Sequence, residues 1–290
     1  MPTITADDGV RLYYEEAGTG TPIVFVHEFL GEIRCWEPQI RHFSRRYRCI
    51  AYNARGYPPS DVPDRVEDYS FEHQRAGIRA VLDGLGIEKA HIVGLSMGAF
   101  ATFYFGMKWP ERALSLTLAG IGSGAMPDAR AQFRHESEAA ADRLLADGWE
   151  RSAEARAISP TRVQYQNKDP RGFADFVGML RQHSAKGSAL TLKGYQALRP
   201  ALGTFAEEMA ACTVPTLIIS GDEDEPCLDA SLMLKRAMPS AGLCFMPQTG
   251  HACNLEEPAL FNAACETFFH QVESGQYRMR DARALPGRMI

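Results

Sequence analysis

The chain has 290 residues, of which 45% are hydrophobic and 23% charged, an ordinary balance for a soluble globular protein. The formal net charge of −5 argues against nucleic acid or an anionic membrane surface as the main partner. No apolar run reaches the length of a membrane span, and the first residues lack the pattern of a signal peptide. We therefore expect a cytoplasmic protein, and composition leaves open whether it forms a homo-oligomer.

Strand-like and helix-like segments alternate along the chain. An Asp-Gly turn followed by a strand pattern predicts an antiparallel hairpin over residues 3–16. Apolar residues at helical spacing predict an amphipathic helix over residues 71–86, and helices are also expected at 229–238 and 258–272. Short continuous apolar runs predict strands covered on both faces at 22–27, 47–53, 91–95, 114–120, 215–221 and 242–247. This order predicts an α/β fold, a mostly parallel sheet with helices on both faces.

Residues 121–204 break the alternation, because they contain no convincing strand. Glycine and proline divide the segment into consecutive helices, at Gly148, Pro160, Pro170 and Pro200. We interpret it as a helical lid inserted over the carboxyl edge of the sheet, with residues 1–120 and 205–290 forming the core domain. The alternative is a helical extension that packs elsewhere.

The stretch Gly94-Leu95-Ser96-Met97-Gly98 joins a predicted buried strand to a predicted apolar helix. A sharp turn from strand to helix needs small residues beside the turn residue, whose side chain then projects above the sheet. The first amides of the helix supply positive partial charge where an oxyanion would form. This pattern indicates a nucleophile at Ser96, and the plainer alternative is a serine N-cap between chance glycines.

A serine nucleophile needs a base and a group that orients the base. His251 follows the last predicted strand and precedes the last helix, which places it at the carboxyl edge. The strand before it ends in an acidic run that offers Asp222 and Asp224, unless this run is merely a solvated loop. The other histidines are less suited: His73, His135 and His183 fall on charged helical faces, where a solvated role is expected, and His27 directly follows a strand.

The chain resembles the α/β-hydrolase family over nearly its whole length. The matching segments are VFVHEFLG, YNARGYPPSD, VGLSMG, SGDEDEPC and TGHACNLEEP, in the family's order of serine, acid and histidine. In that family the acid usually stands three residues after the glycine that ends the strand, so the resemblance implies Asp224, with Asp222 as the second choice. It also implies that His251 transfers the proton of Ser96 and that Asp224 fixes the tautomer of His251.

One position departs from the family, which commonly has glycine after the histidine that follows the first buried strand. Here the sequence is His27-Glu28-Phe29, and the resemblance implies an oxyanion hole built by the amides of Phe29 and Met97. A carboxylate at Glu28 would oppose the charge that develops there. We expect Glu28 to point away and pair with a basic residue such as Arg34 or Arg55. Alternatively His27 and Glu28 contact the substrate, or the hole is altered and the chemistry differs.

These features predict an enzyme that works without metal or cofactor. A serine rather than an aspartate at position 96 argues against epoxide hydrolases and haloalkane dehalogenases, and no phosphate-binding loop is present. The leading hypothesis is hydrolysis of a small or medium carboxylic ester or lactone through an acyl-enzyme on Ser96. The alternatives are C–C bond cleavage beside a ketone, perhydrolysis or acyl transfer, and a ligand receptor that keeps the hydrolase shell. The seven scattered cysteines predict buried free thiols, neither a disulfide framework nor a zinc site.

Overall fold

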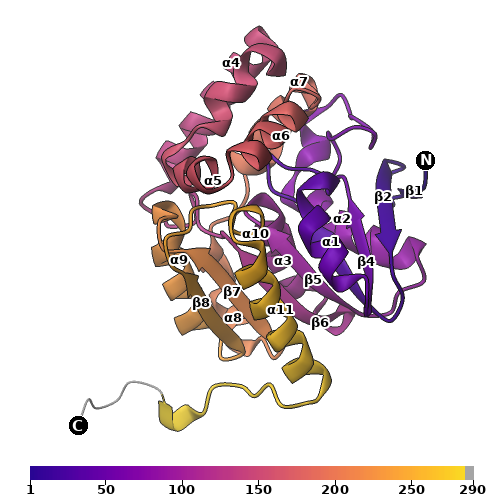
Figure 1. Ribbon diagram of the computed structural model, residues 1–290, viewed down its shortest axis with the longest axis vertical. Coiled ribbons are helices and arrows are strands. Elements are labelled where there is room, and N and C mark those ends of the chain that lie inside the picture. Colours follow the sequence, from indigo (N-terminus) through magenta and orange to yellow (C-terminus); the bar gives the residue numbers. More distant parts are fainter. Residues whose placement is uncertain (285–290) are drawn as a thin grey trace.

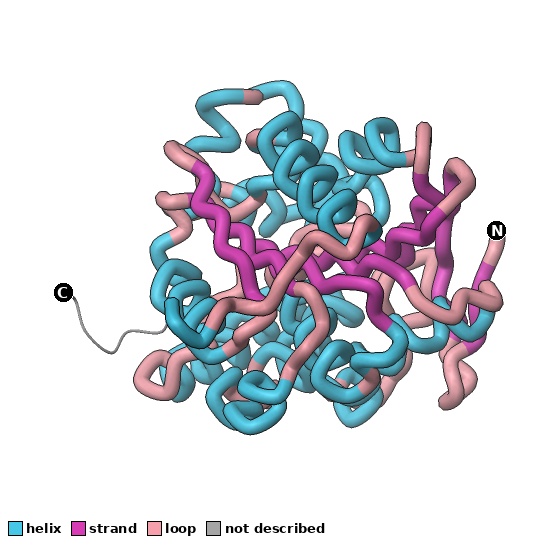
Figure 2. The backbone as a smooth tube through the Cα atoms, turned by 90° about the horizontal axis from the view of Figure 1, so that it is seen from below, coloured by secondary structure: helices cyan, strands magenta, loops and turns pink. Residues whose placement is uncertain are grey.

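The computed structural model describes residues 1–284, and its strands form one eight-stranded sheet with helices on both faces (Figure 1 and Figure 2). Strand β2 pairs antiparallel with β1 and β4, and all other neighbouring strands are parallel. The mostly parallel α/β sheet and its N-terminal hairpin, as predicted from the sequence, are confirmed. Across the sheet the order is β1 (Thr3–Thr5), β2 (Arg11–Ala17), β4 (Tyr47–Tyr52), β3 (Thr21–Val26), β5 (Ala90–Leu95), β6 (Ala113–Ala119), β7 (Thr216–Gly221) and β8 (Ala241–Met246).

Helices cover both faces of the sheet and the edge at which the parallel strands end. The α-helices are α1 (Glu37–Phe43), α2 (Phe71–Gly84), α3 (Met97–Lys108), α4 (Arg130–Ala157), α5 (Val163–Lys168), α6 (Pro170–Leu180), α7 (Ala185–Thr191), α8 (Ala206–Ala211), α9 (Glu225–Ala237), α10 (Cys253–Glu256) and α11 (Pro258–Glu273). A π-helical turn covers Leu192–Gln196, and short 3-10 turns lie at Ile33–Trp36, Val66–Tyr69, Pro110–Arg112, Pro160–Arg162, Leu202–Phe205 and Ala282–Ala284.

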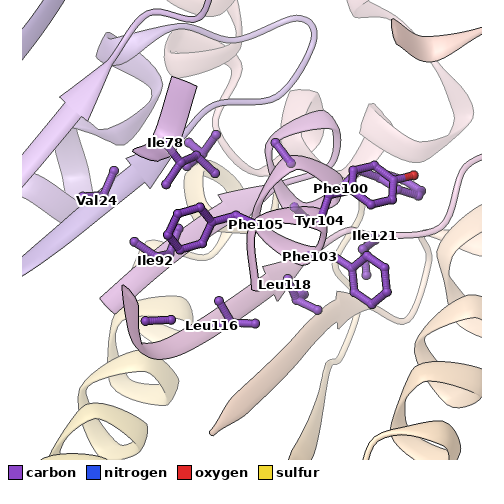
Figure 3. Packing of buried hydrophobic residues seen from close by; sticks show 14 of the residues in the cluster. Val24, Ile78, Ile92, Phe100, Phe103, Tyr104, Phe105, Leu116, Leu118 and Ile121 are labelled. Atoms are coloured by element: carbon purple, nitrogen blue, oxygen red, sulfur yellow. The ribbon is translucent and has the colours of Figure 1, made fainter. Parts of the chain in front are cut away.

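The central strands are buried on both faces, which explains their continuous apolar sequences. Every residue of β5 and of β7 is buried. On one face α2, α3 and α9 bury a core that includes Phe100, Phe105 and Leu116 (Figure 3). On the other face α1 and α11 bury a second core around Phe25 and Phe269. The two cores fix the strands between helical layers, so the loops at the strand ends start from a rigid frame.

The parallel register places the ends of four strands at the same edge. Val26 is level with Gly94, and Ala119 is level with both Leu95 and Ile219. The loops after β3, β5, β6 and β7 therefore begin side by side. Ligands of open α/β sheets bind at this edge.

Helices α4 to α7 stand above this edge, between β6 and β7 in the chain (Figure 1). Gly148, with φ of 70°, divides α4 into two helices at the position where the sequence predicted a break. None of the helices described is long and apolar enough to cross a bilayer. All seven cysteines are free, and all but Cys244 are buried, as expected.

Candidate active site

Ser96 lies at the sharp turn between β5 and α3 with φ of 52° and ψ of −113°, a conformation that is rare outside glycine. A β carbon at Gly94 would lie 2.4 Å from the carbonyl oxygen of Gly98. A β carbon at Gly98 would lie 2.1 Å from the carbonyl oxygen of Val26 on β3. Both glycines are therefore required by the close approach of the helix to two strands. The strand-to-helix turn expected at Ser96 is present.

The backbone amides of Met97 and Phe29 are the expected donors of the oxyanion hole. Met97 is the first residue of α3, and Phe29 follows β3; within residues 1–284 neither amide has a hydrogen-bond acceptor. The hydroxyl of Tyr57 donates to the carbonyl oxygen of Phe29 at 2.8 Å, and that of Tyr195 donates to the carbonyl oxygen of Met97 at 3.2 Å. The two tyrosines therefore hold the peptide groups that directly follow Phe29 and Met97 in the chain, a role that the sequence did not reveal.

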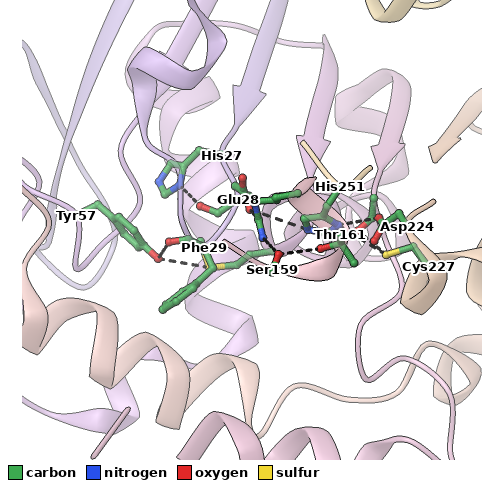
Figure 4. A network of polar contacts seen from close by, with 12 residues as sticks. His27, Glu28, Phe29, Tyr57, Ser159, Thr161, Asp224, Cys227 and His251 are labelled. Carbon is green, nitrogen blue, oxygen red and sulfur yellow. Dashed lines mark hydrogen bonds and ion pairs between the residues drawn. The ribbon is translucent and has the colours of Figure 1, made fainter. Parts of the chain in front are cut away.

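His251 and Asp224 form a buried hydrogen-bonded pair (Figure 4). His251 Nδ1 lies 2.7 Å from Asp224 Oδ2, and the backbone amide of His251 donates to the carbonyl oxygen of Thr161 at 2.7 Å. Burial alone would raise the pKa of Asp224, but the charge and hydrogen bond of His251, together with Cys227 and Arg162, hold the pKa below its ordinary value. Asp222 is exposed, and its Oδ1 accepts the amide of Thr249 at 3.2 Å. The structure thus places Asp224, and not Asp222, against His251.

Cys227 completes a cluster that has the residue types of a metal site. Its Sγ lies 4.0 Å from His251 Nδ1 and donates to the carbonyl oxygen of Gly120 at 3.3 Å. Asp224, Cys227 and His251 form the one such cluster in the described part of the chain. A metal would have to separate the histidine from the aspartate, and burial raises the pKa of the Cys227 thiol well above its ordinary value. The geometry therefore fits a histidine–carboxylate hydrogen bond better than a metal centre.

Glu28 does not point away from this pair. Its side chain is 2% exposed, its Oε2 pairs with Arg162, and the same oxygen lies 4.0 Å from His251 Nε2 (Figure 4). The expected partners were wrong, because Arg34 pairs with Glu32 and Arg55 with Asp8. Arg162 follows Glu28 by 134 residues, and only the packing of the segment between β6 and β7 brings them together.

His27, which we considered as a substrate contact, instead braces the loop after β3. Its Nδ1 lies 2.7 Å from the carbonyl oxygen of Glu28, and its Nε2 accepts the amide of Ala54 at 3.0 Å. These partners require a neutral ring that carries its proton on Nδ1. Burial lowers the pKa of His27 to about 4, which keeps the ring neutral at physiological pH.

His183 also differs from expectation, because it is not a solvated helical histidine. Its ring packs edge-on against Tyr57 and Trp149, and both ring nitrogens are enclosed without a partner among residues 1–284. Burial lowers its pKa to about 3. The ring therefore packs between the loop after β4 and the helices above the sheet.

Ser96, His251 and Glu28 line one cavity of about 420 Å³. Its other walls come mainly from the segment between β6 and β7, and they include the buried arginines Arg162 and Arg199. The volume lies in the ordinary range of small-molecule sites. Ser96 and His251 thus line one ligand-sized space, and Asp224 is hydrogen-bonded to His251.

A family model described as the alpha/beta hydrolase fold matches residues 21–258, and the chain belongs to this family. The chain is 26% identical over 246 residues to 3-oxoadipate enol-lactonase 1 of Acinetobacter baylyi, covering 82% of this chain and 85% of that protein. A thermophilic esterase from Thermogutta terrifontis matches with a TM-score of 0.84 and 24% identity, covering 93% of this chain and 98% of that one. The enol-lactonase from Burkholderia xenovorans LB400 matches with a TM-score of 0.79 and 20% identity, covering 93% and 100%. Fold and family therefore place the chain among the hydrolases.

The buried pair of Glu28 and Arg162 generates the first testable prediction. Removing one charge leaves the other buried and uncompensated, so Glu28→Gln and Arg162→Gln should each lower the free energy of unfolding, by about 3 kcal/mol. The double variant should recover much of this loss, because both charges are then gone. Urea unfolding of the wild type and the three variants measures the coupling.

The exposed pair of Glu37 and Arg41 provides the matched control. Its double-mutant cycle should give a much smaller coupling that weakens with salt. If the losses in the free energy of unfolding at positions 28 and 162 simply add in the double variant, the ion pair does not stabilise the loop after β3.

Proposed function

We propose that the protein is a serine hydrolase that cleaves a small or medium carboxylic ester or lactone through an acyl-enzyme on Ser96. The observation that carries this proposal is one cavity lined by an elbow serine and by a histidine whose Nδ1 is hydrogen-bonded to a buried aspartate. An Nδ1–H that donates to Asp224 leaves His251 Nε2 free to accept a proton. Relatives that carry the names enol-lactonase and esterase support the same class of substrate.

The reaction would proceed in two halves. In acylation, His251 Nε2 takes the proton of Ser96 Oγ while the oxygen attacks the substrate carbonyl carbon, and the resulting oxyanion accepts hydrogen bonds from the amides of Met97 and Phe29. Collapse breaks the ester C–O bond, and His251 returns the proton to the leaving oxygen. In deacylation, water gives a proton to His251 and attacks the acyl carbon, which releases the acid and restores Ser96.

In this proposal Glu28 and Arg162 affect the stability of the charges that form during the reaction. The carboxylate near His251 Nε2 would stabilise the imidazolium that forms in both halves of the reaction. The same carboxylate would repel the oxyanion, and the guanidinium of Arg162 compensates its charge. The pair therefore allows an acid to occupy a position where the family commonly has glycine.

We also propose that the helical segment of residues 121–204 acts as a lid. It contributes the Thr161 carbonyl that holds the amide of His251, the guanidinium of Arg162 and the hydroxyl of Tyr195. A cover that excludes water strengthens each of these interactions. In this proposal the lid is part of the catalytic arrangement as well as a wall of the cavity.

C–C bond cleavage beside a ketone is the second candidate, and Glu28 is the observation that favours it. That reaction has to protonate the carbon that leaves, and a second carboxylate beside His251 could take part in the additional proton transfer. A panel of simple aryl esters and β-diketones, with the products identified, separates the two reactions. A receptor that has the hydrolase fold without hydrolytic activity would turn over neither the esters nor the β-diketones.

The nucleophile is tested by labelling and by substitution. A fluorophosphonate should modify Ser96 alone, as read by peptide mass spectrometry, because Ser96 is the serine of the cavity wall that stands at the strand-to-helix turn. Ser96→Ala should abolish ester turnover at an unchanged melting temperature. Full activity in Ser96→Ala, or a label on another residue, would remove the basis of the proposal.

The acid is tested by a matched pair of substitutions in the same loop. Asp224→Asn should lower kcat by about ten-thousandfold if the pair behaves as in serine proteases, because the histidine tautomer is no longer fixed. Asp222→Asn should have little effect, since its carboxylate is exposed and accepts only a backbone amide. Steady-state kinetics on an activated ester measure both; the reverse order would transfer the role to Asp222.

A further inference from the structure

Arg199 is a buried cation in the cavity wall for which the chain supplies no anion. It follows the π-helical turn that ends at Gln196, is 3% exposed and lines the same cavity as Ser96. One nitrogen, Nη2, donates to the carbonyl oxygen of Ser123. Its Nε and Nη1 are enclosed and have no hydrogen-bond acceptor in residues 1–284, and no carboxylate of this region lies within 4.0 Å. Arg162, in contrast, is paired with Glu28.

Aromatic rings cover the faces of the Arg199 guanidinium. Its Cζ lies 3.6 Å from the ring centroid of Phe100 and 4.8 Å from that of Phe133. These contacts stabilise the cation, and the N–H groups of a guanidinium point along its own plane. Burial lowers the pKa of Arg199 to about 10, so the group still carries its charge at neutral pH.

The acids in the cavity wall are engaged elsewhere. Glu28 pairs with Arg162, and Glu136 accepts a hydrogen bond from Gln132 at 2.8 Å. A buried charge without a counter-charge is costly, and proteins usually pair such groups or use them to bind a ligand. Arg199 therefore holds a buried charge that no acid of the described residues neutralises, and an anion in the adjoining cavity would supply the missing counter-charge.

We propose that Arg199 binds a carboxylate of the substrate, so that the ester or lactone which this site cleaves also carries a free acid group. A planar guanidinium with donors free in its own plane matches a carboxylate and contributes directional hydrogen bonds. The inference rests on the proposed hydrolase function and narrows its substrate class to acidic esters and lactones. A structural cation, held only by Phe100, Phe133 and the Ser123 carbonyl, is the alternative.

Matched substrates separate the two accounts. 4-Acetoxybenzoic acid and its methyl ester place the charge on the leaving group, and monomethyl and dimethyl adipate place it on the acyl group. Within each pair, the ratio of kcat/KM for the acid to that for the neutral ester reports on recognition of the carboxylate. For at least one pair, Arg199→Met should lower this ratio by about ten- to hundredfold, the range for a lost hydrogen bond to a charged group.

Arg156→Met is the control, because Arg156 also lines the cavity but is half-buried and donates to the carbonyl oxygen of Ala140. It should change the ratio by less than about threefold. Arg199→Lys keeps the positive charge but loses the planar arrangement of N–H donors. Its ratio of kcat/KM for the acid to that for the neutral ester should therefore fall between those of the wild type and Arg199→Met. Melting temperatures and turnover of the neutral esters show whether each variant is folded.

The outcomes distinguish this inference from the proposed function. Turnover of neutral esters through Ser96 with an unchanged ratio in Arg199→Met would overturn the inference and leave the hydrolase proposal intact. If no ester is turned over, the hydrolase proposal fails. Calorimetry then measures whether 4-hydroxybenzoate and adipate bind, which tests the carboxylate site at Arg199 independently of turnover. Binding by the wild type that Arg199→Met loses would support the carboxylate site, and equal binding or none would overturn it.

Discussion

Helix α3 begins so close to β3 and β5 that neither Gly94 nor Gly98 has room for a β carbon. This close approach leaves Ser96 at a positive φ and directs the first amides of the helix to the edge where the parallel strands end. The same helix buries Phe100 and Phe105 against the sheet, so the turn is fixed by the core beneath it. Strain at a single residue persists only where its surroundings are this rigid. The position of Ser96 in the cavity wall and the position of the Met97 amide next to it both follow from that packing.

The electrostatics of the site depend on residues that the inserted helical segment supplies. The turn before α5 contributes both the carbonyl that holds the His251 amide and the guanidinium that neutralises Glu28. The π-helical turn after α7 contributes Tyr195, and Arg199 follows it. Loops at the edge of the sheet thus supply Ser96, Asp224 and His251, whereas the segment between β6 and β7 supplies Arg162 and Arg199 in the cavity wall. Two buried arginines from this segment line the cavity in different states: Arg162 is paired with Glu28, and Arg199 has no acid partner among the described residues.

Local patterns predicted the fold well, because continuous apolar runs mark strands that are covered on both faces. The turn at Ser96 was also predictable, since two glycines around a serine between strand and helix leave few other conformations. Asp224 was implied by the resemblance to the family, whose acid usually stands at this offset from the strand end, and the structure places it against His251. Such features depend on neighbours within a few residues of the chain.

Interactions between distant segments were not predictable in the same way. Nothing near Glu28 indicates Arg162 as its partner, and the expected partners, Arg34 and Arg55, belong to other acids. The position of His183 on a polar helical face predicted solvation, but tertiary packing encloses its ring. The role of Arg199 likewise depends on which side chains surround it, and the spacing of residues along the sequence does not reveal these neighbours. These interactions between distant segments set the charges and the packing around the cavity.

An acyl-enzyme on Ser96 is the central claim, and rapid acid quench followed by mass spectrometry tests it most directly. The protein is mixed with 4-acetoxybenzoic acid methyl ester, quenched within milliseconds to seconds and digested. The account predicts a transient acetyl group on the peptide that contains Ser96, which forms before steady state and disappears when substrate is exhausted. Steady turnover without any acetylated peptide, or an acetyl group on a different residue, would contradict it.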